Sequence, residues 1–129
     1  MLNGLLAMDQ DPALIGIGSY LGGGMARMGH VCGALSGAAV SLGLRNQLNV
    51  DGHGNNSNDA FDELQKLFRG FQEEFGATTC RDLLGCDISS AEGFREAKRR
   101  QALVRCPDYV SRTCDRLNEI IEQSGNKCS

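Results

Sequence analysis

Residues 58–76 read NDAFDELQKLFRGFQEEFG, and this stretch decides the fold class. Its apolar side chains recur three, four and seven positions apart, which is the spacing of one face of an α-helix. They are Phe61, Leu64, Leu67, Phe68, Phe71 and Phe75. Ser57 or Asn58 can cap the start of this helix, and Gly76 is a natural stop after its last turn. The pattern predicts a long amphipathic helix whose aromatic stripe faces a core.

Three more helices are predicted after Gly76. Thr78-Thr79 caps a short helix that Gly85 ends, and Ser89-Ser90 starts a polar helix that runs to about Arg100. Pro107 begins the last helix, because proline is favoured at a first helical position. One face of that last helix carries Val110, Cys114, Leu117 and Ile121.

Two helices are predicted before Ser57. Asp11-Pro12 starts the first, which glycines 22–24 end after Leu21. The second begins within residues 28–32 and runs to about Leu42, where Gly43 stops it, and residues 45–58 form a polar loop. Strand-like alternation is absent from the sequence. We therefore expect an all-α fold, a bundle of about five or six helices, with residues 1–129 as a single domain.

Composition narrows the function classes. The chain has 129 residues and a net charge of −3, which argues against nucleic acid as the main partner. The opening residues lack the basic and apolar pattern of a secretory signal. The longest apolar run, from Val31 to Leu44, is shorter than the roughly 20 residues of a membrane span. We expect a reducing, cytoplasmic setting without membrane insertion, in which the six cysteines are reactive or metal-binding rather than structural disulfides.

Three cysteines share one kind of position, the start of a predicted helix: Cys32, Cys80 and Cys106. The positive end of the helix dipole favours the thiolate, which is both the nucleophile and the metal ligand. Nearby Arg27, His30 and Arg81 can add to this effect. The pattern predicts thiols whose pKa is lowered from about 8.5 toward neutrality.

The remaining cysteines and both histidines carry weaker signals. Cys114 lies on an apolar face and is expected to fill the core, Cys128 lies in the tail without a role, and Cys86 is compatible with either role. None of the spacings is the C-x-x-C of a zinc or thioredoxin site. His30 and His53 are expected to be solvated loop residues.

Residues 22–44, GGGMARMGHVCGALSGAAVSLGL, followed by residues 71–87, FQEEFGATTCRDLLGCD, and by Cys106, carry a resemblance to a known family. The chain resembles the redox-active proteins named for a C-GCAxxG-C-C signature, over roughly residues 14–121. Residues 32–37 stand as CGALSG, in the order CGAxxG. The resemblance makes Cys80 the third signature cysteine and Cys106 the fourth, and it implies thiol redox chemistry or an iron–sulfur cluster.

One element departs from the family pattern. The family has a cysteine a few tens of residues before CGAxxG, and no cysteine precedes Cys32 in this sequence. By spacing, that position falls just before Met1, so the resemblance predicts a shortened N-terminus or a lost thiol. A four-thiol site would then lack one member here.

Three functions remain open at this stage. In the first, Cys32 and either Cys80 or Cys106 cycle between dithiol and disulfide with an unknown redox partner. In the second, the same three cysteines hold a metal or an iron–sulfur cluster, completed by Cys86, a histidine or an outside ligand. In the third, the chain is a non-catalytic interaction module. The small residues of the helix after Cys32 make a homodimer an expectation in each case.

Overall fold

The computed structural model describes residues 16–48 and 58–126 of the chain. Three long helices dominate it: α2 (Gly33–Leu48), α3 (Asn58–Phe75) and α6 (Cys106–Asn126). The short helices α4 (Cys80–Leu84) and α5 (Ala91–Arg99) and the 3₁₀ turn η2 (Ala102–Arg105) lie between α3 and α6 in the chain. The all-α expectation is confirmed, since the described residues form helices and one isolated backbone bridge.

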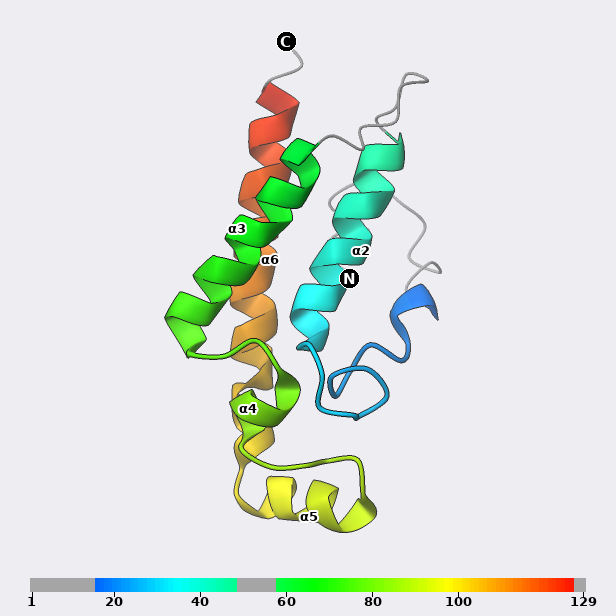
Figure 1. The fold of residues 1–129 in the computed structure, drawn as a ribbon, viewed down its shortest axis with the longest axis vertical. Helices are drawn as coiled ribbons and strands as arrows, with labels where there is room; N and C mark the ends of the chain where they lie inside the picture. Colours follow the sequence, from blue (N-terminus) through cyan, green and yellow to red (C-terminus); the bar gives the residue numbers. More distant parts are fainter. Residues whose placement is uncertain (1–15, 49–57, 127–129) are drawn as a thin grey trace.

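The long helices run side by side, with α2 and α6 parallel and α3 antiparallel to both (Figure 1). The N-termini of α2 and α6 therefore lie at the same end of the bundle. The short helices α4 and α5 occupy that end as well (Figure 1). We call it the short-helix end, and it brings the starts of three helices together.

The bundle core is built from the stripe predicted for α3. Phe71 is fully buried, and its ring lies 4.8 Å from Phe75 and 5.8 Å from Tyr109 of α6, measured between centroids. From α2, Leu35 is likewise fully buried. The core cluster consists of Leu35, Ala38, Leu42, Leu67, Phe71, Tyr109 and Leu117. Burying a large apolar side chain contributes about 1.5–3 kcal/mol, so this cluster is the main stabilising feature.

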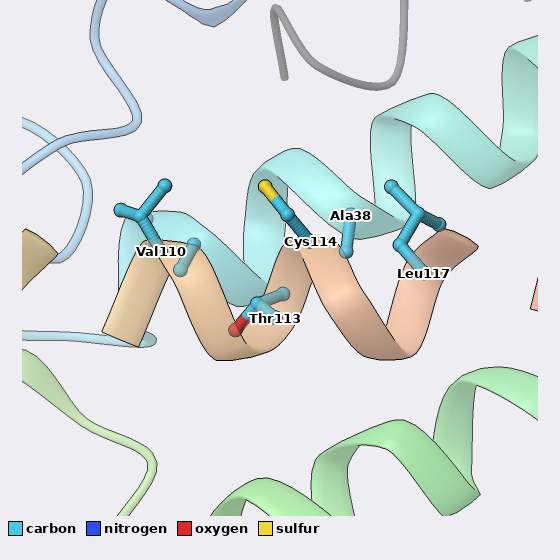
Figure 2. Close-up of a pocket in the computed structure, with 7 residues that line it drawn as sticks. Ala38, Val110, Thr113, Cys114 and Leu117 are labelled. Atoms are coloured by element: carbon cyan, nitrogen blue, oxygen red, sulfur yellow. The ribbon is translucent and has the colours of Figure 1, made fainter. Parts of the chain in front are cut away.

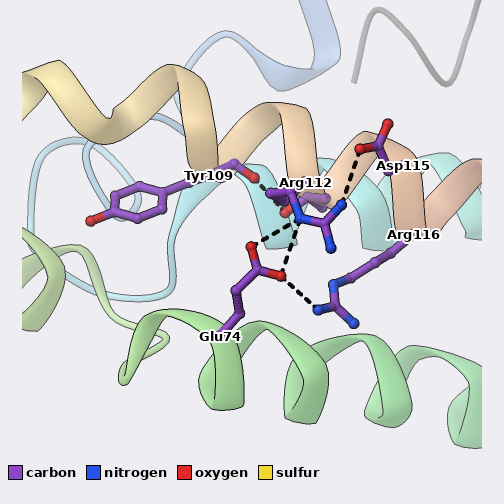
Figure 3. A network of polar contacts seen from close by, with 6 residues as sticks. Glu74, Tyr109, Arg112, Asp115 and Arg116 are labelled. Atoms are coloured by element: carbon purple, nitrogen blue, oxygen red, sulfur yellow. Dashed lines mark hydrogen bonds and ion pairs between the residues drawn. The ribbon is translucent and has the colours of Figure 1, made fainter.

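An ion-pair network fastens the C-terminal end of α3 to α6 on the surface of the bundle. The Glu74 carboxylate accepts hydrogen bonds from Arg112 at 2.9 and 3.1 Å and from Arg116 at 2.9 Å (Figure 3). Arg112 also reaches Asp115 at 3.3 Å. Hydrogen bonds from both arginines lower the pKa of Glu74, so the carboxylate stays ionised well into the acid range.

The short helices follow their predicted caps. Thr79 caps α4 by accepting a hydrogen bond from the Asp82 N–H, and Gly85 ends the helix at a φ of 71°. Ser90 caps α5 by accepting from the Gly93 N–H. These contacts confirm both cap predictions, and they fix where Cys80 begins its helix.

Two of the predicted helix boundaries are wrong. Gly43 does not stop α2, which continues to Leu48 through the start of the predicted polar loop. An internal glycine costs only about 1 kcal/mol. Beyond it, the buried Arg45 contacts Glu63 of α3 at 3.7 Å and the Ile120 carbonyl of α6 at 3.5 Å. These tertiary contacts outweigh the local tendency of Gly43 to end the helix. The rest of the predicted polar loop, residues 49–57, lies outside the described part.

The predicted helix from Asp11 to Leu21 is also not found where it can be examined. Residues 1–15 lie outside the described part, and residues 16–18 form a single 3₁₀ turn followed by turns. From Gly23 to Arg27, five consecutive residues have positive φ, between 53° and 74°. This is a left-handed turn, and each non-glycine residue in it costs roughly 1–2 kcal/mol. Three of its residues, Met25, Ala26 and Arg27, bear that cost.

Candidate functional site: a cysteine cluster at the short-helix end

The three predicted site cysteines each lie at a helix start. Cys32 directly precedes α2, whose first hydrogen bonds run from the Leu35 and Ser36 N–H groups to the Cys32 carbonyl at 2.9 and 3.1 Å. Cys80 is the first residue of α4, and Cys106 is the first residue of α6. All three helices begin at the short-helix end of the bundle (Figure 1).

A backbone bridge fastens the Cys32 segment to the Cys80 segment. Val31 and Thr79 form an isolated antiparallel bridge. The Cys32 N–H donates to the Thr78 carbonyl at 2.8 Å, and the Cys80 N–H donates to the His30 carbonyl at 2.7 Å. In an antiparallel bridge, the residues that follow the two bridged residues point their side chains to the same side of the backbone pair. Cys32 follows Val31 and Cys80 follows Thr79, so the two cysteines are diagonal neighbours.

The left-handed turn holds residues 29–32 in this position. The His30 N–H donates to the Gly24 carbonyl at 2.9 Å, and the Arg81 N–H donates to the Gly29 carbonyl at 3.2 Å. A Cβ on Gly24 would collide with the backbone of His30, and one on Gly29 would lie 3.1 Å from Arg81 Cβ. The glycines of this loop are therefore needed where the backbone approaches the cysteine segments most closely.

An apolar cluster gathers the other cysteines. Cys80, which is 9% exposed, packs with Leu84, Ile88 and Ala97. The half-buried side chains packed against this cluster are Cys86, Phe94, Ala102, Leu103 and Cys106. Cys86, whose role the sequence left open, therefore lies beside two of the three predicted site cysteines. Its thiol donates to the Leu84 carbonyl at 3.6 Å.

The Cys32 thiol lies at the start of the helix that follows it. The backbone N–H groups of Ala34 and Leu35, the second and third residues of α2, favour its thiolate. Burial raises the pKa of the Cys32 thiol, while these two backbone donors lower it. The predicted effect of the helix start is therefore present at Cys32, but the net direction is upward because desolvation is the larger effect.

Burial also raises the thiol pKa at the other two helix starts, so the predicted lowering is wrong for all three cysteines. The pKa of Cys80 rises to about 11, first through desolvation and then through repulsion from the thiolates of Cys32, Cys106 and Cys86. Desolvation and the Cys32 thiolate raise the pKa of Cys106. The sulfurs of Cys32, Cys86 and Cys106 therefore all lie within electrostatic range of the Cys80 sulfur.

A comparison with family models matches residues 1–120 to C_GCAxxG_C_C, described as "Putative redox-active protein (C_GCAxxG_C_C)". The chain belongs to this family. No curated protein and no solved structure matches the chain. The resemblance read from the sequence is thus confirmed at the level of the family and of its redox-active description.

The CGAxxG part of the family motif, residues 32–37, covers Cys32 and the first turn of α2. A Cβ on Gly33 would lie 3.0 Å from the Leu21 carbonyl oxygen and 3.3 Å from Gly22 Cα. The carbonyl of Gly37, at the end of this segment, accepts a hydrogen bond from the buried Ser41 hydroxyl at 2.8 Å. The small residue after Cys32 therefore allows the glycine-rich loop to approach the start of α2 closely.

We call Cys32, Cys80, Cys86 and Cys106 the thiol cluster. Cys114 lies apart from it, two turns along α6 from Cys106. It projects from the same side of α6 as Val110 and Leu117 (Figure 2), as their spacing predicts. A pocket of about 90 Å³ between α2 and α6 is lined by these three residues and by Gly33, Ala34, Ala38 and Thr113. Val110 is 46% exposed, so the predicted apolar face is only partly buried at its N-terminal end.

The histidines and Cys128 add no further side chain to the candidate site within the described residues. His30 is exposed, as predicted for a loop histidine, and its backbone rather than its ring bonds the Cys80 segment. His53 and Cys128 lie outside the described residues. Within residues 16–48 and 58–126, no group of three or more His, Cys, Asp or Glu side chains is arranged to hold a metal ion. No helix in those same ranges is long and apolar enough to span a bilayer.

Sequence reasoning missed Phe94. It is the only aromatic residue of the polar helix α5, and its ring packs on the apolar cluster that includes Cys80. The Arg27 guanidinium carbon lies 4.4 Å from the ring centroid, and Lys98 Nζ lies 4.6 Å from it. A single aromatic side chain in an otherwise charged helix was the available signal.

Proposed function

We propose that this chain is a thiol–disulfide redox protein in which Cys32 and Cys80 cycle between the dithiol and the disulfide. The observation that carries the proposal is the backbone bridge between Val31 and Thr79, which makes the two cysteines diagonal neighbours. Cys106, packed against Cys80, is the alternative second thiol. The redox-active description of the family supports the same chemistry.

Cys32 is the attacking thiol in this proposal. The backbone N–H groups of Ala34 and Leu35 favour its thiolate, whereas burial and like-charge repulsion raise the pKa of Cys80 to about 11. The Cys32 thiolate attacks a disulfide of a partner protein, and one partner sulfur leaves as a thiolate. The Cys80 thiolate then attacks Cys32 in the mixed disulfide and releases the second partner sulfur. The partner gains two electrons, and the two protons from Cys32 and Cys80 end on its thiols.

Closing the disulfide requires a small movement. Diagonal neighbours in an antiparallel pair have Cα atoms about 7–8 Å apart, whereas disulfides usually span about 4.4–6.8 Å. To reach the commonest disulfide span of about 5.5–6 Å, the segment before α2 and the start of α4 would approach each other by roughly 1–2.5 Å on oxidation. Such a shift lets the oxidised and reduced forms present different surfaces at the short-helix end.

The test is to equilibrate the reduced protein with glutathione disulfide, alkylate the remaining thiols and map the peptides by mass spectrometry. We expect a Cys32–Cys80 disulfide that Cys32→Ser abolishes and that the matched control Cys114→Ser leaves unchanged. A bond from Cys32 to Cys106 would make Cys106 the second thiol. Failure of Cys32 to form any intramolecular disulfide would contradict the proposal.

The metal alternative is tested by measuring the metal content of the purified protein. Anaerobically purified protein would contain stoichiometric iron or zinc, and Cys32→Ser, Cys80→Ser and Cys106→Ser would each remove it. That result would replace the dithiol proposal. The non-catalytic module would be favoured if neither a disulfide nor a metal formed.

The homodimer and the cytoplasmic setting stay predictions. On α2, the buried Ala38 belongs to the core of the chain itself and lines the pocket against α6. This small residue therefore serves a contact within one protomer. Sedimentation of the reduced and oxidised protein would measure the oligomeric state.

A further inference from the structure

Two cations share one aromatic ring beside the thiol cluster. The Arg27 guanidinium carbon lies 4.4 Å and Lys98 Nζ 4.6 Å from the centroid of Phe94. Both side chains are exposed, and neither forms an ion pair with a carboxylate within the described ranges. Because both side chains are positive and no carboxylate of the described residues pairs with them, the surface around Phe94 attracts anions.

Two carboxylates near this ring are already paired with other residues. Glu96 contacts Arg99 at 2.6 Å and Arg100 at 3.2 Å, and Asp87 lies 3.8 Å from Arg81. These acidic groups therefore do not neutralise the two cations on Phe94.

The position of this site links it to the cysteines. Phe94 packs on the apolar cluster of Cys80, against which Cys106 also packs. Arg27 ends the left-handed turn that leads into the Cys32 segment. An anion bound by Arg27 or by Lys98 therefore lies at the same end of the molecule as the thiols.

Apolar surface adjoins the two cations. Met25 and Met28, on either side of Arg27 in the chain, are 51% and 50% exposed. Methionine side chains adapt to irregular partner surfaces, and exposed cations add orientation and speed of encounter. This combination matches an acidic polypeptide segment that also carries apolar side chains.

We propose that Arg27 and Lys98, held together by the ring of Phe94, dock an acidic segment of the protein whose disulfide the thiol cluster reduces. This inference rests on the proposed function, because it names the chemistry of the partner for the same cysteines. The docked carboxylates raise the local concentration of the partner disulfide at Cys32.

The test compares two small disulfides of opposite charge, dianionic dithiodipropionate and dicationic cystamine, as substrates of the full-length reduced chain. Each molecule oxidises the protein dithiol and is released as two thiols. The two disulfides differ in intrinsic reactivity through their leaving thiols, so the measured quantity is how the ratio of the two rate constants changes with salt. We expect this ratio to favour the dianion more strongly at about 10 mM salt than near 1 M, where charges are screened beyond about 3 Å. Rate constants come from acid quenching and mass spectrometry.

Single substitutions test whether Arg27 and Lys98 cause the preference for the dianion. Arg27→Gln and Lys98→Gln should each lower the rate constant for the dianion about two- to fivefold at low salt, as expected for exposed charges. Lys66→Gln, the same charge change on an exposed residue of α3, is the control and should leave the ratio of the two rate constants unchanged. Thermal unfolding of Lys98→Gln verifies that a surface substitution has not altered the fold.

The outcomes separate the two proposals. A ratio of the two rate constants that changes neither with salt nor with Arg27→Gln or Lys98→Gln overturns the docking inference and leaves the dithiol function intact. Absence of exchange with either disulfide overturns both. A faster reaction with the dianion that Lys66→Gln diminishes as much as Lys98→Gln does would reflect overall charge and would also overturn the docking inference.

Discussion

Alanine at Gly24 tests how the glycine-rich loop positions the cysteines. Gly24 is buried with a φ of 74°, and an added Cβ would collide with the His30 N–H and lie 2.6 Å from the His30 carbonyl oxygen. That carbonyl accepts the hydrogen bond from the Cys80 N–H. Both atoms belong to the backbone, so no side-chain rotation can relieve the collision. Gly24→Ala should therefore destabilise the fold and disturb the bridge between the cysteine segments.

Two other glycines separate the contributions to the effect. Gly76 has a φ of 84° and open space around its missing Cβ, so Gly76→Ala should cost only the roughly 1–2 kcal/mol of a left-handed alanine. Gly22 lies outside the left-handed region and also has open space, so Gly22→Ala should be neutral or stabilise by about 0.4–1 kcal/mol. Gly24→Ala adds an unrelieved collision to the left-handed cost, which gives about 2–5 kcal/mol.

The assay is urea unfolding of the reduced protein at 25 °C, with the free energy of unfolding extrapolated to water. We expect Gly22→Ala to be the most stable of the three variants, Gly76→Ala to be intermediate and Gly24→Ala to be the least stable. Disulfide formation by Cys32, measured in the same samples below the unfolding transition, should fall only in Gly24→Ala. Equal unfolding midpoints for Gly24→Ala and Gly76→Ala would refute the reasoning, because the contact with His30 would then carry no cost.

Two further predictions concern titration. Because burial and like-charge repulsion raise the pKa of Cys80 to about 11, folded protein holds this proton more tightly than unfolded protein. Stability should therefore be full below about pH 8.5 and fall as pH rises toward 11, and Cys80→Ala should flatten this decline, measured by urea unfolding across pH. Hydrogen bonds from Arg112 and Arg116 lower the pKa of Glu74, so stability present above its unfolded pKa should be lost as pH falls. Glu74→Gln should lower the unfolding midpoint at neutral pH and weaken its acid dependence, and an unchanged acid profile would contradict this assignment.

Sequence reasoning predicted the helices wherever local signals were strong. The apolar spacing of residues 58–75 and the caps at Thr79 and Ser90 depend on side chains within a turn of one another, so they are visible without a fold. It failed at Gly43, where the contacts of Arg45 with α3 and α6 extend α2. Those contacts join residues far apart in the sequence, and no local pattern encodes them.

The positions of the three cysteines were predictable, but their electrostatics were not. Sequence signals placed Cys32, Cys80 and Cys106 at helix starts, where the structure has them. The direction of the thiol pKa depends on burial in an apolar cluster formed by α4, α5 and η2, which sequence alone does not locate. The place of Cys86 in that cluster depends on the same packing.

The bridge between Val31 and Thr79 also governs how the chain must be refolded. Cys32 approaches Cys80 only after α2, α3 and α4 have assembled, whereas Cys80 and Cys86 are near one another in any unfolded chain. Short loops close most readily, so oxidant present before assembly would trap the local Cys80–Cys86 pair first. A reductant must therefore accompany renaturation until the helices have docked, and only then does oxidation act on the native arrangement of sulfurs.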